Sequence, residues 1–166
     1  MPELPEPNID QVRSAMREHD EAQRTEGRLQ EGVSVTSLDL DGEDRFQRLR
    51  RELGVNAFGL NLIRLRPRER GRIHMHERQE EVYVVLEGTL TLEVEGEPRE
   101  LQRGTAARVG PRVRRQLSNR GTELLAILAI GGAEAHEGRD GRAFTSWEDE
   151  TGARPQEIPL PPDLEP

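Results

Sequence analysis

Short runs of apolar residues, separated by turn-forming residues, occupy the middle of the chain from residue 58 to residue 131. The runs are FGLNLIRLRP, RIHMH, EVYVVLEG, TLTLEVEG, EPRELQRG, TAARVG, RVRRQLSN and ELLAILAIGG. The breaks between them fall at Pro67, Gly71, Gly88, Gly96, Gly104 and Gly121. Short strands at regular spacing, with turn signals between them, are typical of a β-sandwich or a β-barrel. The pattern therefore predicts an all-β domain of about eight strands over residues 58–131.

Two kinds of strand are expected within this domain. The run TLTLEVE at 89–95 alternates between apolar and polar residues, which is typical of an antiparallel strand with one face in the core and one in water. The runs at 82–86 and 124–130 are apolar on both faces, so each needs a second layer of cover. We expect a homodimer, in which the partner or a swapped N-terminal segment covers one face of the first run. The residues of that face are Val82, Val84 and Leu86.

Residues 1–57 form an N-terminal flank with short helices and a strand that could be swapped between subunits. Two stretches in it have helical spacing, and Gly54 supplies a stop signal for the second. The apolar positions of these stretches are Ile9, Val12, Ala15 and Met16, and then Phe46, Leu49 and Leu53. We therefore expect one short helix in each stretch.

Residues 132–166 form a C-terminal extension. Phe144 and Trp147 are expected to pack over one end of the barrel. The Pro-rich end, TGARPQEIPLPPDLEP, has no periodicity and is expected to be extended or disordered. Ile158 and Leu160 are the only residues of this end from which packing is expected.

Composition and charge narrow the choice of partners. The chain of 166 residues has a net charge of −8 and a pI near 5.2, which argues against nucleic acid or an anionic membrane surface as a partner. No apolar stretch reaches the length of a membrane span and the first residues lack the pattern of a signal peptide, so we expect a cytoplasmic protein. Because the chain has no cysteine, a metal ion would need histidine, carboxylate or carbonyl ligands.

Two of the four histidines lie one residue apart, just before a pair of glutamates, in the stretch HMHERQEEVYVVLEG at 74–88. Residues two apart on a strand point to the same face, so His74 and His76 project together, and Glu81 and Tyr83 share a face of the next strand. Two imidazoles and one carboxylate with open coordination positions suit Fe(II), Mn(II), Ni(II) or Zn(II). The alternative is a solvated strand end, at which the imidazoles only form hydrogen bonds with glutamate.

The spacing of these residues resembles the first motif of the cupin family, which reads HxH, three or four residues, Glu, six residues, Gly. His74 and His76, Glu81 after four residues and Gly88 after six more match it. The resemblance covers residues 58–131 and implies a jelly-roll barrel, also called a double-stranded β-helix, with His74, His76 and Glu81 as ligands of a divalent metal. The spacing to Gly88 selects Glu81, and Glu80 is the alternative ligand if the register shifts by one residue.

The second cupin motif is only half present. Gly104 and Asn119 stand at its two ends, but Arg115 occupies the position of the histidine that is the family's fourth metal ligand. Val113, Arg115 and Leu117 alternate with polar residues, so the pattern turns Arg115 inward. A buried guanidinium stays charged and cannot bind a cation, and it therefore needs a partner.

Three roles are open for Arg115. It pairs with Glu81 or Glu80 and replaces the charge of the metal, it binds the carboxylate of a substrate beside a three-ligand metal, or a register shift leaves it at the surface. Tyr83 is expected either to line the same pocket or to be a core residue with its hydroxyl at the edge. His136 is a weaker candidate for the missing ligand.

The resemblance leaves two classes of function open. The first is a small metal-dependent enzyme, a dioxygenase or an isomerase, that acts on a small molecule which Arg115 would orient if it is anionic. The second is a ligand-binding or sensor cupin without metal or catalytic activity. Because the cupin fold carries both kinds of function, the sequence does not decide whether the protein is an enzyme.

Overall fold

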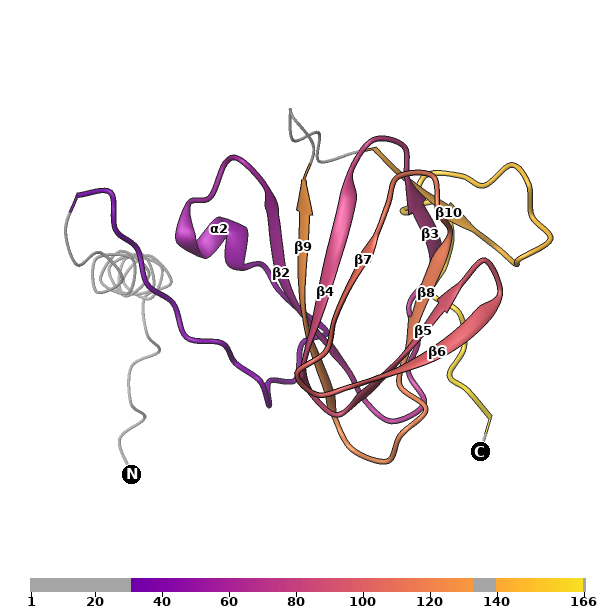
Figure 1. The fold of residues 1–166 in the computed structure, drawn as a ribbon, viewed down its shortest axis with the longest axis horizontal. Coiled ribbons are helices and arrows are strands. Elements are labelled where there is room, and N and C mark those ends of the chain that lie inside the picture. The colour runs from indigo at the N-terminus through magenta and orange to yellow at the C-terminus, as the bar shows by residue number, and fades with distance from the viewer. Residues whose placement is uncertain (1–30, 133–139, 166) are drawn as a thin grey trace, which may run out of the picture. The chain divides into compact units, whose positions relative to one another are not determined.

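The computed structural model describes residues 31–132 and 140–165, and the statements below concern this part of the chain (Figure 1). The chain divides into two compact units, Met1–Ser37 and Leu38–Pro166. The strands and the helix described here belong to the second unit, and the boundary expected at residue 57 lies inside it. The helix expected at 9–16 and the candidate ligand His136 lie outside the described residues.

The described part of the second unit contains ten strands and one short helix. In chain order these elements are β1 (Phe46–Gln47), α2 (Leu49–Leu53), β2 (Gly59–Leu65), β3 (Ile73–His76), β4 (Glu80–Glu87), β5 (Thr89–Val94), β6 (Glu97–Gln102), β7 (Ala106–Val109), β8 (Arg115–Ser118), β9 (Leu125–Gly132) and β10 (Gly141–Phe144). No helix in these residues is long and apolar enough to cross a membrane. The eight strands expected from the sequence are present, as β2 to β9.

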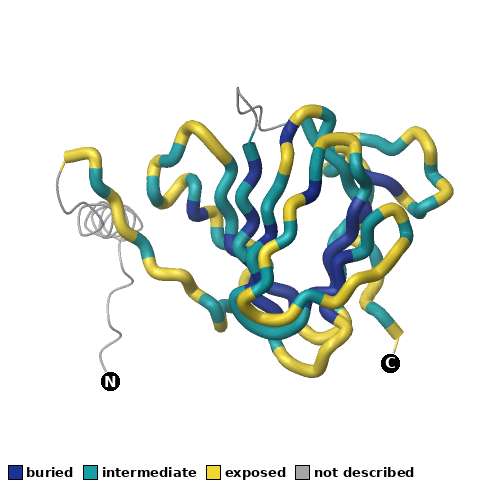
Figure 2. Tube along the Cα trace, viewed as in Figure 1, coloured by how far each residue is buried: buried dark blue, intermediate teal, exposed yellow. Residues whose placement is uncertain are grey.

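The strands form two five-stranded antiparallel sheets, in the orders β1-β2-β9-β4-β7 and β10-β3-β8-β5-β6. The main core lies between the sheets, because its buried members come from both of them. These members are Leu65, Tyr83, Val85, Leu90, Leu92, Val109, Leu117, Leu125, Ile127 and Ala129. Figure 2 shows buried residues along the strands and exposed residues mainly in the turns between them. The expected all-β jelly-roll architecture is confirmed.

The chain passes from the first sheet to the second between β4 and β5, and this crossing requires Gly88. Its φ angle is +74°, in the left-handed region that favours glycine. A Cβ atom at this position would also lie 2.7 Å from the carbonyl oxygen of Leu124. The glycine of the HxH motif therefore has a structural role, which is to let β4 turn sharply against the chain that leads into β9.

Strand β5 is covered on both faces, unlike the expectation from its alternating pattern. Leu90 and Leu92 face the core, but Thr91 is buried too, with only 3% of its surface exposed. Thr91 lies beside Ser118 of β8, where all four residues of the strand are buried. The cover comes from residues 68–72, since Gly71 accepts a hydrogen bond from the side chain of Gln116. The polar residues of a strand can face a covering loop as well as water.

The C-terminal tail packs along this covering segment, so the expectation that it would not pack is wrong. The backbone N–H of Leu164 donates to the carbonyl oxygen of Arg68 over 2.7 Å. The side chains of Arg70 and Arg72 donate to the carbonyl oxygens of Pro162 and Ile158. Hydrogen bonds from arginine side chains and from the backbone of Leu164 hold the tail.

The outer face of the first sheet is partly covered by the chain's own N-terminal flank. A second core cluster there has Leu49, Leu62 and Ala126 as its buried members. Partly buried leucines of the flank and the sheet pack against it, namely Leu40, Leu53, Leu60, Leu86 and Leu128. Leu86 thus finds its cover within one chain, and the homodimer stays a prediction. Phe46, expected on a helix, instead pairs with Ile63 in β1, and helix α2 begins at Leu49.

Candidate metal and ligand site

The expected site residues come from both sheets and meet between them. His74 and His76 lie on β3 of the second sheet, and Arg115 on β8 is the direct neighbour of His74. Glu81 and Tyr83 lie on β4 of the first sheet. The tertiary fold therefore brings together residues that the sequence separates by up to 41 positions, from His74 to Arg115.

Glu81, and not Glu80, faces the histidines. One carboxylate oxygen of Glu81, Oε2, lies 3.5 Å from Nε2 of His74 and 3.3 Å from Nε2 of His76. Glu80 is exposed and pairs with Arg108 on β7. The choice of Glu81 from the motif spacing is thus the one that agrees with the geometry. The candidate ligand atoms of His74, His76 and Glu81 all lie within 4.8 Å of one another.

The outer nitrogen of each imidazole is held by an acceptor. Nδ1 of His74 lies 3.1 Å from the carbonyl oxygen of Arg72, and Nδ1 of His76 lies 2.8 Å from Oδ1 of Asp140. A carbonyl oxygen and a carboxylate accept hydrogen bonds, so each Nδ1 carries the hydrogen. In the neutral rings both Nε2 lone pairs then face Glu81. Three acceptor atoms in this arrangement repel one another unless a proton or a metal ion lies between them.

Asp140 is a residue of this site that the sequence analysis missed. Besides His76, it accepts hydrogen bonds from the backbone N–H groups of Arg78 and Gln79 and from the side chain of Gln79. Burial opposes its ionisation, but these hydrogen bonds and the one with His76 lower the pKa of Asp140. The residue precedes β10 in a polar stretch without periodicity, so no pattern in the sequence pointed to it.

Arg115 is fully buried, and each of its three guanidinium nitrogens donates a hydrogen bond. Its terminal nitrogens donate to Oε2 of Glu81 over 2.7 Å and to the carbonyl oxygen of Val113 over 2.9 Å, and its Nε donates to the hydroxyl of Tyr83 over 3.2 Å. The hydroxyl of Tyr83 in turn donates to Oε2 of Glu81. Since Arg115 has no exposed surface, the expectation that a register shift could leave it at the surface is wrong.

These contacts determine the charges of the site. Burial alone would raise the pKa of Glu81, but hydrogen bonds with the two imidazoles, which form when Nε2 carries a proton, and the charge of Arg115 hold it well below its usual range. Burial lowers the pKa of His76, but its interactions with Glu81 and Asp140 outweigh this and raise it. Burial and the nearby charge of Glu81 raise the pKa of Tyr83, so that its hydroxyl stays a donor.

A pocket of about 830 Å³ opens onto this site, and its volume is in the range that accommodates small molecules. His76 and Glu81 are among its lining residues. The others include Gln79 and Asp140 beside them, Gly59, Asn61, Ala129 and Gly131 from the first sheet, Arg48, Arg50 and Arg51 near α2, and Arg154, Pro155, Gln156 and Glu157 from the C-terminal extension. Gly131 leaves room for Glu81, because a Cβ atom at Gly131 would lie 3.3 Å from Cγ of Glu81.

Arg115 and Tyr83 do not line this pocket, and Tyr83 is only 1% exposed. Their expected contact with a substrate stays a prediction. Both side chains donate hydrogen bonds to the carboxylate of Glu81. Tyr83 also belongs to the main core, which agrees with the second of the two roles expected for it.

The sequence and the fold are similar to those of known proteins. A family model described as a cupin domain matches residues 61–131. The fold is similar to that of a cupin protein from Bacteroides fragilis, with 23% identity over 66% of this chain and 92% of that one and a TM-score of 0.56. Residues 61–131 are therefore a cupin domain, by the family match and by the fold. No match was found among curated proteins.

Two further structures similar to this cupin carry a functional description. One is a sugar phosphate isomerase of the cupin superfamily from Silicibacter pomeroyi, with 25% identity over 77% of this chain and 88% of that one and a TM-score of 0.55. The other, a proposed sugar phosphate isomerase from Acidithiobacillus ferrooxidans, is 30% identical over 52% of this chain with a TM-score of 0.50. The match spans 56% of the length of that second protein.

Proposed function

We propose that this cupin binds a divalent transition metal, Fe, Mn, Ni or Zn, through Nε2 of His74, Nε2 of His76 and the carboxylate of Glu81, and that it acts on a small anionic molecule. The observation that carries the proposal is the convergence of these three acceptors, with both Nδ1 atoms already engaged. Imidazoles held in this way by a carbonyl and a carboxylate are typical of metal ligands. The donor set therefore fits a metal bound by three protein ligands.

Arg115 supports the anionic character of the ligand. Its charge offsets that of Glu81, so with neutral imidazoles the floor of the site keeps only the negative charge of Asp140. A divalent ion added there leaves a positive site, which attracts an anion. Arg115 and Tyr83 act as positioning residues, since their hydrogen bonds orient the carboxylate of Glu81 and keep it ionised.

Isomerisation of a sugar phosphate is the first reaction to test, because two similar structures are described in this way. The reaction moves hydrogen between neighbouring carbon and oxygen atoms of one molecule, so it needs no external oxidant or reductant. When bound, a divalent ion would polarise the carbonyl or hydroxyl groups of such a substrate. The chain's own contribution would be to fix the direction of His76 through Asp140 and to enclose the ligand in the pocket.

A metal-free ligand-binding cupin is the second candidate, and the Arg115–Glu81 pair favours it. The pair places a fixed positive charge 2.7 Å from the only carboxylate of the candidate metal group. In this case Arg115 replaces the metal, and the histidines carry a proton or bind the ligand directly.

Metal content separates the two candidates. Elemental analysis of the protein purified without an affinity tag, followed by calorimetric titration with Mn(II), Ni(II) and Zn(II), should give one metal site that His74→Ala and His76→Ala each abolish. Glu80→Gln is the matched control and should bind metal as the wild type does. Arg115→His should tighten binding, since it removes a positive charge and adds an imidazole. Metal binding by this variant alone would establish the metal-free alternative.

A further inference from the structure

The mouth of the pocket differs in charge from the rest of the molecule. Acidic residues outnumber basic ones in the chain, 32 to 24, and all 24 basic residues are arginines. Four of these arginines line the pocket that reaches His76 and Glu81. Two segments that lie far apart in the sequence supply them: Arg48, Arg50 and Arg51 come from the N-terminal flank, and Arg154 comes from the C-terminal extension.

Three of the four arginines have no side-chain partner among the described residues. Arg50 is half-buried, and its Nε donates to the carbonyl oxygen of Val55 over 3.0 Å. Arg48, Arg51 and Arg154 are exposed, and their side chains form no hydrogen bond or ion pair with any residue that the structure describes. Some exposed arginines elsewhere pair with carboxylates, as Arg108 does with Glu80.

Among the described residues, the acidic side chains of the pocket form no ion pair with these three arginines. Glu81 pairs with Arg115, and Asp140 accepts its hydrogen bonds from the loop before β4 and from His76. The carboxylate of Glu157 accepts from the backbone N–H of Arg154 over 3.1 Å. The guanidinium groups at the mouth therefore remain available to a ligand.

We propose that Arg48, Arg51 and Arg154, the arginine cluster, form a phosphate subsite at the mouth of the pocket, which selects phosphorylated small molecules as ligands. A planar guanidinium group can donate two parallel hydrogen bonds to phosphate oxygens. This fixes the orientation of the phosphate, which a point charge such as an ammonium group does not. Arg48 is the N-cap residue of α2 and Arg51 lies inside the helix, and both line the pocket. A phosphate bound there leaves the rest of the ligand to extend towards His76 and Glu81.

This inference rests on the proposed function for the reaction at the floor of the pocket, but phosphate binding itself needs no metal. The subsite also gives a role to the N-terminal flank and the C-terminal extension. Both lie outside residues 61–131, which the cupin family model matches. The cupin barrel would carry the chemistry, and the two added segments would recognise the substrate.

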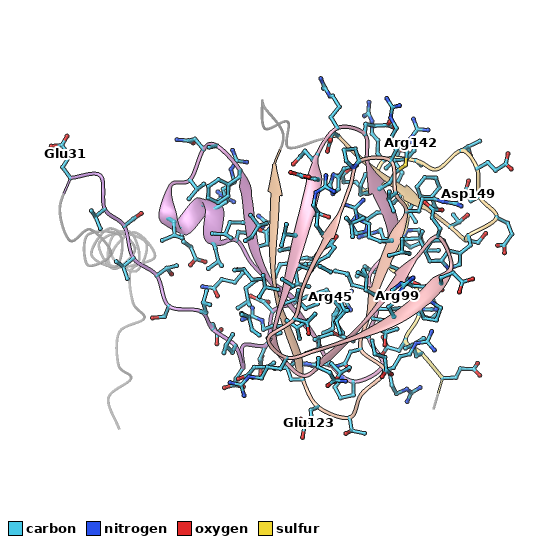
Figure 3. All side chains as sticks on the ribbon, in the orientation of Figure 1. Glu31, Arg45, Arg99, Glu123, Arg142 and Asp149 are labelled. Carbon is cyan, nitrogen blue, oxygen red and sulfur yellow. The ribbon has the colours of Figure 1, made fainter. Side chains whose placement is uncertain are left out.

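The test compares two triple variants that change the net charge equally. Arg48→Ala/Arg51→Ala/Arg154→Ala removes the arginine cluster. Arg66→Ala/Arg99→Ala/Arg103→Ala removes three exposed arginines away from the pocket, of which Arg99 on β6 is labelled in Figure 3. Calorimetric titration of the full chain with ribose 5-phosphate, ribose and inorganic phosphate is the measurement.

Wild type and the control variant should bind ribose 5-phosphate and inorganic phosphate, and should bind ribose far more weakly. The cluster variant should bind both phosphates at least about tenfold more weakly than wild type. Equal losses in the two triple variants would mean that only the overall charge matters, and would overturn the subsite. If the cluster variant does not fold, as judged by circular dichroism, Arg51→Ala and Arg154→Ala carry the test singly, each with a several-fold loss expected.

The His76→Ala variant separates this inference from the proposed function. If it loses metal and keeps phosphate binding, both stand. If wild type binds phosphate through the arginine cluster but takes up no metal, the subsite stands and the metal-dependent function falls. If wild type binds metal but neither phosphate compound, the subsite is wrong and the metal site is unaffected.

Discussion

Two arginines are buried among the residues that the structure describes, and they use their charge in different ways. Arg64 on β2 and Arg115 on β8 are 4% and 0% exposed. Arg64 points away from the main core and donates to the carbonyl oxygens of Asp44 and Asp39. Arg115 points into the barrel, where it pairs with Glu81. One side chain fastens a surface segment to the sheet, and the other sets the charge of a site.

The two arginines differ in whether water can replace the guanidinium at the carboxylate that it faces. The carboxylate of Asp39, which also faces Arg64 at 3.3 Å, has a side chain that is 63% exposed, so water can replace the guanidinium. The side chain of Glu81 is 16% exposed and lies beside two imidazole nitrogens that in the neutral rings are acceptors. The loss of stability on removing a buried arginine is therefore expected to be larger when water cannot reach its partner.

Arg115→Ala is expected to have the largest effect on stability. It leaves the carboxylate of Glu81 buried without its counter-charge, which costs about 3 to 5 kcal/mol of the free energy of unfolding. Chemical denaturation followed by circular dichroism measures the loss. Adding Glu81→Gln removes the uncompensated charge and should recover part of it. A single variant as stable as wild type would show that the pair does not stabilise the barrel.

Arg64→Ala is expected to cost less, about 1 to 3 kcal/mol, because the acceptors it leaves behind are backbone carbonyls close to water. The same denaturation experiment applies, and protease digestion should show faster cleavage in residues 39–45, which Arg64 holds. A loss as large as that of Arg115→Ala would remove the distinction between the two arginines.

Asp140→Asn is expected to weaken metal binding and also to lower stability, because the amide nitrogen cannot accept the hydrogen bonds that the carboxylate accepts from Arg78 and Gln79. The amide can present its N–H to Nδ1 of His76, which would reverse the tautomer and take the lone pair from Nε2. Metal affinity should then fall by about 10- to 100-fold. Titration with Zn(II) and Mn(II) measures it. Unchanged affinity would mean that Asp140 only fastens the loop before β4.

Glu80→Gln is expected to have the smallest effect. The residue pairs with Arg108 at the surface, and exposed ion pairs contribute about 0 to 1 kcal/mol. Its stability and metal affinity should both match those of wild type. Reduced metal affinity would indicate that the register of β4 differs in solution, with Glu80 as the ligand.

Much of the fold and part of the site could be predicted from the sequence, because the signals were local. Turn residues between short apolar runs located β2 to β9, and the two-residue period of a strand predicted that His74 and His76 share a face. The same period predicted that Arg115 points inward. The roles of β1 and β10 could not be predicted, since two or four residues carry too little pattern and their pairing depends on distant strands.

The sequence by itself determined which residues could form a metal site, because ligand chemistry and strand period are properties of the residues and their neighbours. Only the tertiary structure decided that Arg115 pairs with Glu81 and that Asp140 holds His76. It also brought Arg48 and Arg51 to the same pocket as Arg154, across more than 100 residues of chain. These contacts join segments that are far apart in the sequence. They could not be predicted, because burial and pairing depend on which surfaces of the two sheets pack against each other.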